Sequence, residues 1–119
     1  MNRIIDKIRR HKRRKVRIRK RIHGTADKPR MTVFKSNRYV YIQVIDDDKG
    51  FTLVSVSNKE KELNSIKSNK KEISQLGEIM GTRLKEKNIT QVVFDRNGYK
   101  YHGVIKCIAD AARKTGIIF

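Results

Sequence analysis

The 119-residue sequence is poor in the residues that characterise several large classes of protein. It contains one cysteine, one proline and no tryptophan. One cysteine cannot form a disulfide framework, and with three scattered histidines it does not supply the ligands of a zinc site, so we expect no metal or other cofactor. Because no run of eighteen apolar residues exists and no apolar stretch follows the basic start, we expect neither a membrane span nor a secretory signal.

Acidic residues are scarce relative to basic ones. Thirty Lys and Arg stand against twelve Asp and Glu, which gives a formal net charge of +18. Self-repulsion of this size destabilises a compact state unless a polyanion screens it, so the charge predicts a polyanionic partner. Residues 1–30 carry fourteen of the basic residues and two of the acidic ones, a net of +12, whereas residues 31–119 carry +6. This asymmetry is typical of a basic arm on an ordinary globular domain.

The arm is predicted to occupy residues 1–28, and the domain residues 29–119. Twelve of the nineteen residues from Arg3 to Arg21 are basic, and the HGTADKP stretch soon after them is a natural boundary. Apolar residues near the start of the arm have helical spacing, but Val16 and Ile18 alternate with arginine as in a strand. Because no single period persists and like charges four residues apart repel, we expect the arm to be mobile in the free protein and partly helical once its charges are neutralised.

Strand signals begin where the domain begins. Residues 30–35 and 51–57 are short candidate strands, and residues 38–46 form a longer one between them. Side chains alternate between the two faces of a strand. One face of the longer strand therefore carries Val40, Ile42 and Val44.

Two turns connect these strands into a meander. Ser36–Asn37 is predicted to form a tight turn because Asn tolerates a positive φ. Residues 46–50 form the second turn, where Gly50 is available for a left-handed conformation. A polar connection over residues 58–68 follows the third strand.

A helix is predicted over residues 70–87. Asn69 can cap its N-terminus, and Glu72 follows three residues later as the partner in a capping box. Its buried stripe consists of four apolar residues at helical spacing: Ile73, Leu76, Met80 and Leu84. Gly77 and Gly81 share this face, a spacing that indicates close packing of the helix on the sheet rather than a ligand site.

The C-terminal segment contains two conflicting signals. Residues 91–95 form a short buried strand, and Asn97–Gly98 after it is typical of a hairpin turn that leads into another strand. From Val104 onward, however, apolar residues recur at helical spacing, and Asp110 with Lys114 forms a favourable i, i+4 pair. We favour the helix over the additional strand.

The helix completes the predicted fold. Gly116 stands where this helix should end, and Cys107 on its apolar side is expected to be a buried structural thiol. A three-stranded meander is then followed by helix, strand and helix. This order predicts an α/β (α+β-like) domain, a mixed four-stranded sheet flanked by helices, with a flexible basic N-terminal arm.

Phosphate attraction is the function that the composition supports best. If about half of the arm cations touch phosphates, the logarithm of the binding constant should fall against the logarithm of salt with a slope of roughly −4 to −5. Isoleucines among the arginines suggest that the bound arm also packs on the domain or in an RNA groove. A solvated tail with a nuclear-import or membrane-surface role is the alternative, but the arm lacks aromatic residues and a continuous apolar face.

The domain adds aromatic residues, and an exposed ring beside a cation can stack on an unpaired base. The candidates are Phe34, Tyr39, Tyr41, Tyr99 and Tyr101. For Phe34 and Tyr39 we favour a role within the sheet or core. For Tyr41 and Tyr99 both roles stay open.

Catalysis has little support. The aspartates at 46–48 could attract a divalent cation, but three consecutive side chains on a turn point in different directions, so a solvated turn is favoured. Asp95, Arg96 and His102 could form an acid–base set, yet no nucleophile accompanies them and no second carboxylate is placed for two-metal chemistry. We therefore expect no enzymatic activity.

Four blocks carry a resemblance to a known family. They are the Arg/Lys arm, residues 29–50 (PRMTVFKSNRYVYIQVIDDDKG), the helix with its two glycines, and residues 92–119 (VVFDRNGYKYHGVIKCIADAARKTGIIF). Together they resemble the bacterial form of large ribosomal subunit protein eighteen, the 5S-rRNA-binding family. The resemblance covers essentially the whole chain, and FDRNGYKYHGVIKCIADAAR is its most specific part. Many relatives have Gly where this chain has Asn97, which also tolerates a positive φ.

The resemblance implies a fold and a function. It implies a mixed sheet flanked by helices and supports the helix after Asn97–Gly98. It also implies a cytoplasmic structural component of the large ribosomal subunit, monomeric when free, that binds 5S rRNA. Such a protein helps to attach 5S rRNA to 23S rRNA, beside neighbouring ribosomal proteins of the central protuberance. The resemblance assigns no role to the 58–71 linker.

The expected RNA contacts, carried over by motif, come from the arm, from the first turn (Ser36–Arg38) and from the loop after the predicted strand 91–95 (Arg96–His102), which we call the late loop. They are Arg9, Arg10, Lys12, Arg13, Arg14, Lys15, Arg17, Arg19, Lys20, Arg21, Arg30, Ser36, Asn37, Arg38, Tyr41, Arg96, Asn97, Tyr99 and His102. Two alternatives remain, a general DNA-architectural binder and a small nuclease. Charge alone does not separate RNA from DNA binding, because phosphate attraction is common to both.

Overall fold

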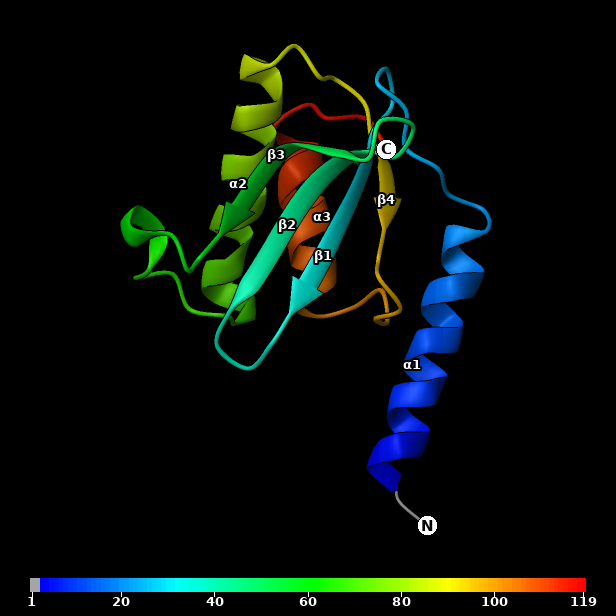
Figure 1. Ribbon diagram of the computed structural model, residues 1–119. Coiled ribbons are helices and arrows are strands. Elements are labelled where there is room, and N and C mark those ends of the chain that lie inside the picture. Colours follow the sequence, from blue (N-terminus) through cyan, green and yellow to red (C-terminus); the bar gives the residue numbers. More distant parts are fainter. Residues whose placement is uncertain (1–2) are drawn as a thin grey trace.

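The computed structural model describes residues 3–119, which form helices, strands and one short 3₁₀ turn (Figure 1). In chain order the elements are α1 (Arg3–Arg19), β1 (Arg30–Lys35), β2 (Val40–Asp46), β3 (Phe51–Ser57), η1 (Lys61–Leu63), α2 (Lys70–Glu86), β4 (Val93–Asp95) and α3 (Val104–Lys114). The strands form one sheet in the order β3-β2-β1-β4, with β1 antiparallel to β2 and parallel to β4. This confirms the predicted mixed four-stranded sheet. Within residues 3–119, no helix is both long and apolar enough to cross a membrane.

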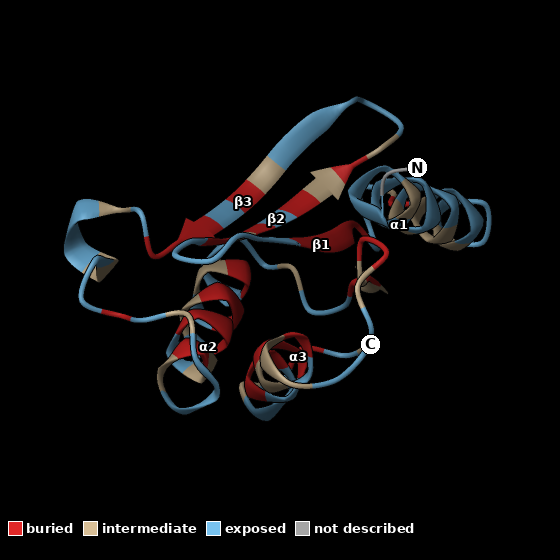
Figure 2. Ribbon diagram, turned by 90° about the horizontal axis from the view of Figure 1, so that it is seen from below, coloured by how far each residue is buried: buried red, intermediate tan, exposed pale blue. Residues whose placement is uncertain are grey.

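Helices α2 and α3 cover one face of the sheet, whereas α1 lies beside its β4 edge (Figures 1 and 2). The predicted inward face of β2 is fully buried, at Val40, Ile42 and Val44. The predicted apolar stripe of α2 is fully buried as well. The core therefore lies between the sheet and two helices, and no described side chain of α1 is buried.

Asn69 caps α2 as predicted, but the Glu72 side chain binds the side-chain amide of Asn69 and not its backbone N–H, so the full capping box does not form. Asn69 Oδ1 accepts a hydrogen bond from the backbone N–H of Glu72 (2.9 Å), and Asn69 Nδ2 donates to Glu72 Oε2 (2.8 Å). The reciprocal pair satisfies an N–H group of the first turn that has no partner within the helix, and so determines where the helix begins. The observed helix ends one residue before the predicted end.

The glycines of α2 face α3, so the predicted helix-on-sheet contact is wrong. A Cβ built on Gly77 would lie 2.5 Å from the carbonyl oxygen of Ile108 and 2.8 Å from the Cβ of Ala111. A Cβ on Gly81 would collide with the side chain of Thr115. Glycine is therefore required at both positions because the backbones of two helices approach closely there.

Gly77→Ala is expected to lower the free energy of unfolding by about 2 kcal/mol. The added methyl group overpacks the α2–α3 contact, which at these short distances costs about 3 kcal/mol, and this outweighs the gain of about 1 kcal/mol from the better helix propensity of alanine. Urea denaturation measures the difference. Glu78→Ala, at an exposed position of the same helix, is the control and should change stability by less than about 0.5 kcal/mol. A Gly77→Ala protein as stable as the wild type would contradict the packing described here.

Both conflicting signals of the C-terminal segment are present in the structure. Asn97 and Gly98 have positive φ (54° and 79°), and the N–H of Tyr99 donates to the carbonyl of Arg96 (3.0 Å), so the tight turn forms. The chain after it enters α3 through Gly103, which also has a positive φ (61°). The favoured helix is confirmed, and Gly103 is the residue that redirects the chain into it.

The β1–β2 turn forms where predicted, but different interactions close it. Asn37 does not have the expected positive φ. Instead, Ser36 Oγ accepts a hydrogen bond from the N–H of Tyr39 (3.2 Å), and the N–H of Ser36 donates to the carbonyl of Tyr39 (2.8 Å). The turn is therefore closed by a backbone hydrogen bond together with the serine hydroxyl, a common role for serine in turns.

Other details also differ from the sequence prediction. β2 begins two residues later than predicted, and β4 covers three residues instead of five. In α3, Asp110 pairs with Arg113 (Oδ1 to Nη1, 3.7 Å) and not with Lys114. Cys107 is half-buried at the margin of the core instead of fully enclosed.

The connection between β3 and α2 is ordered by Asn58, which is 3% exposed. Its Oδ1 accepts a hydrogen bond from the N–H of Val40 (2.9 Å), and its Nδ2 donates to the carbonyls of Arg38 and Ile66 (3.0 Å each). Asn58 therefore ties this polar connection to the β1–β2 turn. A buried, fully bonded amide of this kind gives no distinctive signal in a sequence rich in Asn and Lys.

Candidate nucleic-acid interface

Helix α1 runs through the part of the arm where Val16 and Ile18 alternate with arginine, so the helical pattern prevails over the strand-like one. Half-buried side chains recur on one side of this helix at His11, Arg14, Lys15 and Ile18, which is the spacing of a helix face. That side lies next to the loop between β4 and α3 (Figure 1). The expected mobility of the arm in the free protein stays a prediction.

Three side chains of α1 contact that loop. The contacts are Arg14 Nε to the carbonyl of Gly98 (2.9 Å), Arg19 Nη2 to Asn97 Oδ1 (3.2 Å), and an edge-to-face approach of the His11 and Tyr99 rings with centroids 4.8 Å apart. A Cβ on Gly98 would lie 2.9 Å from the backbone oxygen of His11, so the loop and helix approach closely. The structure thus joins two groups that the sequence analysis treated separately, the arm and the late loop.

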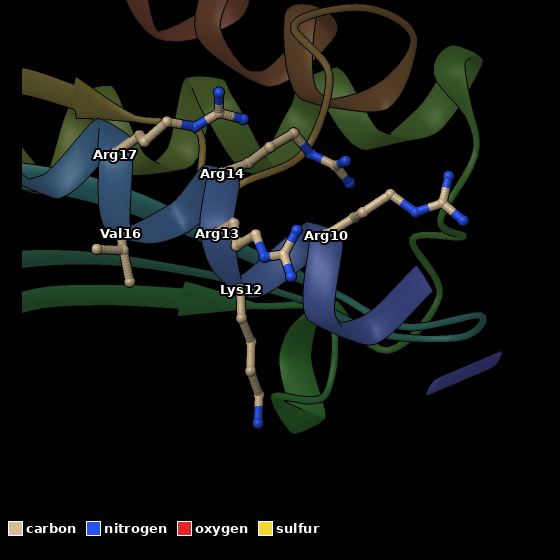
Figure 3. Close-up of a pocket in the computed structure, with 6 residues that line it drawn as sticks. All are labelled: Arg10, Lys12, Arg13, Arg14, Val16 and Arg17. Atoms are coloured by element: carbon tan, nitrogen blue, oxygen red, sulfur yellow. The ribbon is translucent and has the colours of Figure 1, made fainter. Parts of the chain in front are cut away.

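The arm presents exposed cations on its remaining surface. Among the arm residues predicted to contact RNA, the exposed ones are Arg9, Arg10, Lys12, Arg13, Arg17, Arg19, Lys20 and Arg21. A cleft of about 630 Å³ lies among α1 side chains and is lined by Arg10, Lys12, Arg13, Arg14, Val16 and Arg17 (Figure 3). Figure 3 shows the guanidinium groups of Arg10, Arg14 and Arg17 on one side of the helix and Lys12 pointing away from them. Every charged group in this cleft is positive, so it suits the phosphates of a nucleic acid.

A second cleft joins the arm to the domain. It has a volume of about 430 Å³ and is lined by Arg14, Arg17, Ile18, Lys20, Arg21 and Arg96. Arg96 comes from the late loop, where its Nη1 donates a hydrogen bond to the carbonyl of Tyr99 (3.0 Å). A phosphate backbone that follows the arm therefore also reaches a cation held by the loop.

Arg30 lies within a buried group of ion pairs. Its Nη1 donates to Asp95 Oδ2 (2.7 Å), and its Nε and Nη2 donate to the two carboxylate oxygens of Asp47 (2.9 and 3.0 Å). The side chains of Arg30 and Asp95 are 10% and 0% exposed. Arg19 Nε approaches the same Asp95 oxygen at 3.4 Å, so this group links the arm to β1, β4 and the β2–β3 turn. Contact of Arg30 with RNA stays a prediction.

Asp47 also anchors the boundary between arm and domain. Its Oδ2 accepts a hydrogen bond from the N–H of Gly24 (2.8 Å), and its own N–H donates to the carbonyl of Gly24 (2.9 Å). The hydrogen bond from Arg30 lowers the pKa of the Asp47 carboxyl and raises the pKa of the Arg30 guanidinium. The favoured interpretation of residues 46–48 as a solvated turn is therefore wrong for Asp47, and also for Asp46, which is 2% exposed.

Asp47 is expected to make the protein sensitive to acid. A carboxyl whose pKa is lower in the folded state stabilises the fold above its unfolded pKa, and this contribution is lost as the pH falls through the lowered value. The melting temperature of the wild type should therefore fall more than that of Asp47→Asn between about pH 4 and pH 2. Circular dichroism at a series of pH values measures both profiles. Asp27→Asn, at an exposed position of the connection between α1 and β1, should keep the wild-type profile; parallel profiles for the wild type and Asp47→Asn would refute the prediction.

The first turn and the late loop meet through Tyr99. Its Oη donates to the carbonyl of Lys35 (3.1 Å) and accepts a hydrogen bond from the N–H of Lys35 (3.2 Å), at the end of β1. Ser36, Asn37 and Arg38 follow directly and are exposed. The turn therefore lies at the same end of the sheet as the loop that contacts the arm (Figure 1).

The remaining predicted residues lie in different settings. His102 is exposed at the end of the late loop, and Tyr41 is half-buried on the sheet face opposite α2 and α3. Asn97 is 5% exposed, and its side chain accepts the hydrogen bond from Arg19.

The sequence alone did not reveal the acceptors that hold the arm. Asp95 was considered only as part of an acid–base set, yet it binds Arg19 and Arg30, which lie 76 and 65 residues away in the chain. A carboxylate at the end of a buried strand was the available signal, because a buried charge requires a partner of opposite charge. The identity of that partner depends on strand pairing, which local patterns do not specify.

A basic arm, a mixed α/β domain, a cationic cleft on the arm and a second one between arm and domain define a small nucleic-acid-binding protein. The family model for ribosomal L18 of archaea, bacteria, mitochondria and chloroplasts matches residues 5–119. A protein of Treponema denticola named large ribosomal subunit protein uL18 is 59% identical over 114 residues, which is 96% of this chain and 95% of that protein. The proteins of the same name from Treponema pallidum and Borreliella burgdorferi strain B31 are 55% and 52% identical, over 96% and 98% of this chain and 95% and 98% of theirs. The chain therefore belongs to the ribosomal L18 family.

Membership of this family confirms several expectations. The protein is a structural, non-enzymatic component of the large ribosomal subunit, so its partners are ribosomal RNA and ribosomal proteins. Large subunits of bacteria are cytoplasmic, which agrees with the expected localisation. The nuclease alternative is wrong for a protein of this family.

Proposed function

We propose that this protein binds 5S rRNA and helps to attach it to 23S rRNA in the central protuberance of the large subunit, next to neighbouring ribosomal proteins. One observation carries the proposal. The cleft of about 430 Å³ is lined both by arm cations and by Arg96, which belongs to the most family-specific segment of the sequence. The segment that supplies charge and the segment that carries the distinctive motif therefore form one surface.

The two segments have different tasks in this proposal. Contacts with phosphates position a protein and raise its affinity, but they carry no sequence information. The exposed arm cations supply affinity and a fast encounter. The turn at Ser36–Arg38 and the late loop select 5S rRNA. The residues of the late loop that take part are Arg96, Tyr99 and His102.

The domain division is part of the proposal. Residues 1–28 act as an arm that is mobile in the free protein, and residues 29–119 as a monomeric globular domain. The arm carries a high density of like charges, and no described side chain of α1 is buried. Neutralisation by RNA would favour the contacts of Arg14 and Arg19 with the loop, because repulsion along the helix is then screened.

Two of the expected contact residues take supporting positions in the proposal. Arg30 orders Asp47 and Asp95, and Asn97 receives Arg19. Both are almost fully buried, so they affect binding by holding the arm and the loop in position relative to each other.

Competition binding tests the proposal. Labelled 5S rRNA is displaced at moderate salt by unlabelled 5S rRNA, by tRNA and by duplex DNA of comparable length. We expect 5S rRNA to compete at least about tenfold better than either alternative, because specific contacts add to the common phosphate attraction. Equal competition by all three would contradict 5S specificity and favour a general basic nucleic-acid binder.

Arg96→Gln sharpens this test. We expect the variant to lose part of its preference for 5S rRNA while remaining folded, because Arg96 lies in the loop that faces the arm. Lys106→Gln removes the same charge from an exposed position on α3 and is the matched control. If both variants lose affinity equally for every competitor, Arg96 contributes charge only.

A further inference from the structure

One face of the sheet is not covered by α2 or α3, and α1 borders it (Figure 2). The strand register places Thr32 of β1 opposite Gln43 of β2, and Phe34 opposite Tyr41. Because alternate residues of a strand share a face, these four side chains lie together on the side opposite the buried Met31 and Val33. An open sheet face with adjacent aromatic residues is a surface on which unpaired bases can stack.

A groove of about 300 Å³ lies between this face and the arm helix. Lys15 and Arg19 of α1 line one side of it, and the sheet residues Thr32, Phe34, Tyr41 and Gln43 line the other. The volume lies at the small end of the range for ligand sites. The lining combines cations, aromatic rings and neutral polar groups, which are the groups that bind the phosphate, the base face and the base edge of a nucleotide.

Thr32 gives an independent indication of a ligand. The residue is 8% exposed, and its Oγ1 is buried without a hydrogen-bond partner among the residues that the structure describes. A buried hydroxyl without a partner costs free energy, so such groups are rare unless a ligand or partner completes them. Thr32 lines the groove, where the edge of a base would supply a donor or acceptor.

The aromatic residues leave room for stacking. Phe34 lies in β1, which agrees with the favoured role within the sheet, but its side chain is 53% exposed and does not belong to the core. The rings of Phe34 and Tyr41 are tilted by 54° with centroids 6.2 Å apart, and they do not cover each other. A planar base placed against them would bury apolar surface that is otherwise in contact with water.

Lys15 and Arg19 are the cations that line the groove together with Phe34 and Tyr41. Burial lowers the pKa of the Lys15 ammonium, and the neighbouring Arg19 lowers it further. Arg19 is bound to Asp95 and Asn97, whereas within the described residues Lys15 has no ion pair. A phosphate at this position would relieve the repulsion between the two cations.

We propose that this groove binds one unpaired nucleotide of ribosomal RNA, with the base against Phe34 and Tyr41, its edge at Thr32 and its phosphate at Lys15. The inference rests on the proposed function, since it concerns the same RNA. It adds recognition of a base by the sheet to the phosphate contacts of the arm. Docking of α1 completes the groove, so this nucleotide is bound only when the arm is folded on the domain.

Ultraviolet cross-linking of the full-length protein to 5S rRNA tests the proposal directly. A base stacked on an aromatic ring is well placed to cross-link to it, and digestion followed by mass spectrometry locates the modified residue. We expect a cross-linked nucleotide on Phe34 or Tyr41. No cross-link on β1 or β2, in a complex that forms with high affinity, would contradict the proposal.

Substitutions separate stacking from charge. Tyr41→Leu should lower the affinity for 5S rRNA about fivefold to a hundredfold, as expected for loss of one base–aromatic stack, with an unchanged salt slope. Lys15→Gln should instead reduce the magnitude of the salt slope by about one. Phe51→Leu replaces an aromatic residue that is 61% exposed on β3, outside the groove, and should bind like the wild type.

Thr32→Val provides a test in which stability and binding respond differently. The isosteric change removes the unpartnered hydroxyl, so the melting temperature of the free protein should not fall. Affinity for 5S rRNA should nevertheless fall about twofold to tenfold. The proposal of a nucleotide site in the groove would be overturned if affinity is unchanged in all three variants Thr32→Val, Tyr41→Leu and Phe34→Leu. If these variants also keep the preference for 5S rRNA, the proposed function is not affected. Absence of 5S preference in the wild type would instead overturn the proposed function.

Discussion

Deletion of residues 1–22 should weaken binding to 5S rRNA by about 10³-fold to 10⁴-fold at 0.1 M salt and leave a folded domain. Each phosphate that an arm cation neutralises releases counterions, so loss of about five such contacts should flatten the salt slope by about four to five. The domain should survive because, among the described residues, the core cluster begins at Met31 and includes no side chain of α1. Titration at several salt concentrations measures affinity and slope together.

The control for this deletion removes charge elsewhere. Lys61, Lys71 and Lys106 are exposed on the domain and do not line the arm clefts, and their joint replacement by glutamine should change the slope by less than about one unit in total. Circular dichroism and thermal melting check that the truncated protein is folded. An unchanged slope, or an unfolded truncated protein, would show that the role of the arm has been misinterpreted.

Asp95→Ala should lower the free energy of unfolding by about 3–5 kcal/mol, equivalent to a fall in melting temperature of roughly 10–20 °C. Asp95 is fully buried and accepts hydrogen bonds from Arg30 and the backbone N–H of Asn97 (2.7 and 2.8 Å). Its removal leaves Arg30 buried with only Asp47 as a partner. Breaking a buried pair costs more than the pair itself contributes, because the remaining charge stays desolvated.

The matched control is Asp110→Ala, which removes a carboxylate that is 50% exposed and pairs with Arg113 at 3.7 Å. An exposed pair of this kind contributes about 0–1 kcal/mol. Calorimetry of both variants at neutral pH decides the comparison. If Asp95→Ala is no less stable than Asp110→Ala, the buried ion pairs do not hold β1, β4 and the arm together.

The sheet could be predicted from the sequence because each strand carries its own pattern. Residues 30–35 and 51–57 have the predicted ends, and Val40, Ile42 and Val44 face the core. These features depend on alternation and turn residues within a few positions, which the sequence displays directly. The capping of α2 by Asn69 was predictable for the same reason.

The interactions between distant segments could not be predicted in this way. The family resemblance implied that Arg30 contacts RNA, but the pairing of β1 with β4 places it beside Asp95. The glycines of α2 were assigned to the correct face of the helix but to the wrong neighbour, since spacing does not specify whether a helix or a sheet lies opposite. Helix α1 likewise contacts the loop around Gly98, which its own repelling charges do not indicate.

The central claim is that the arm supplies affinity while the domain selects the RNA. Competition between 5S rRNA and duplex DNA of comparable length, measured for the full chain and for residues 23–119, tests it most directly. Both proteins should prefer 5S rRNA, and the preference should persist in the truncated protein although its affinity for each nucleic acid is far lower. If truncation abolishes the preference while the domain stays folded, selection resides in the arm and the claim is wrong.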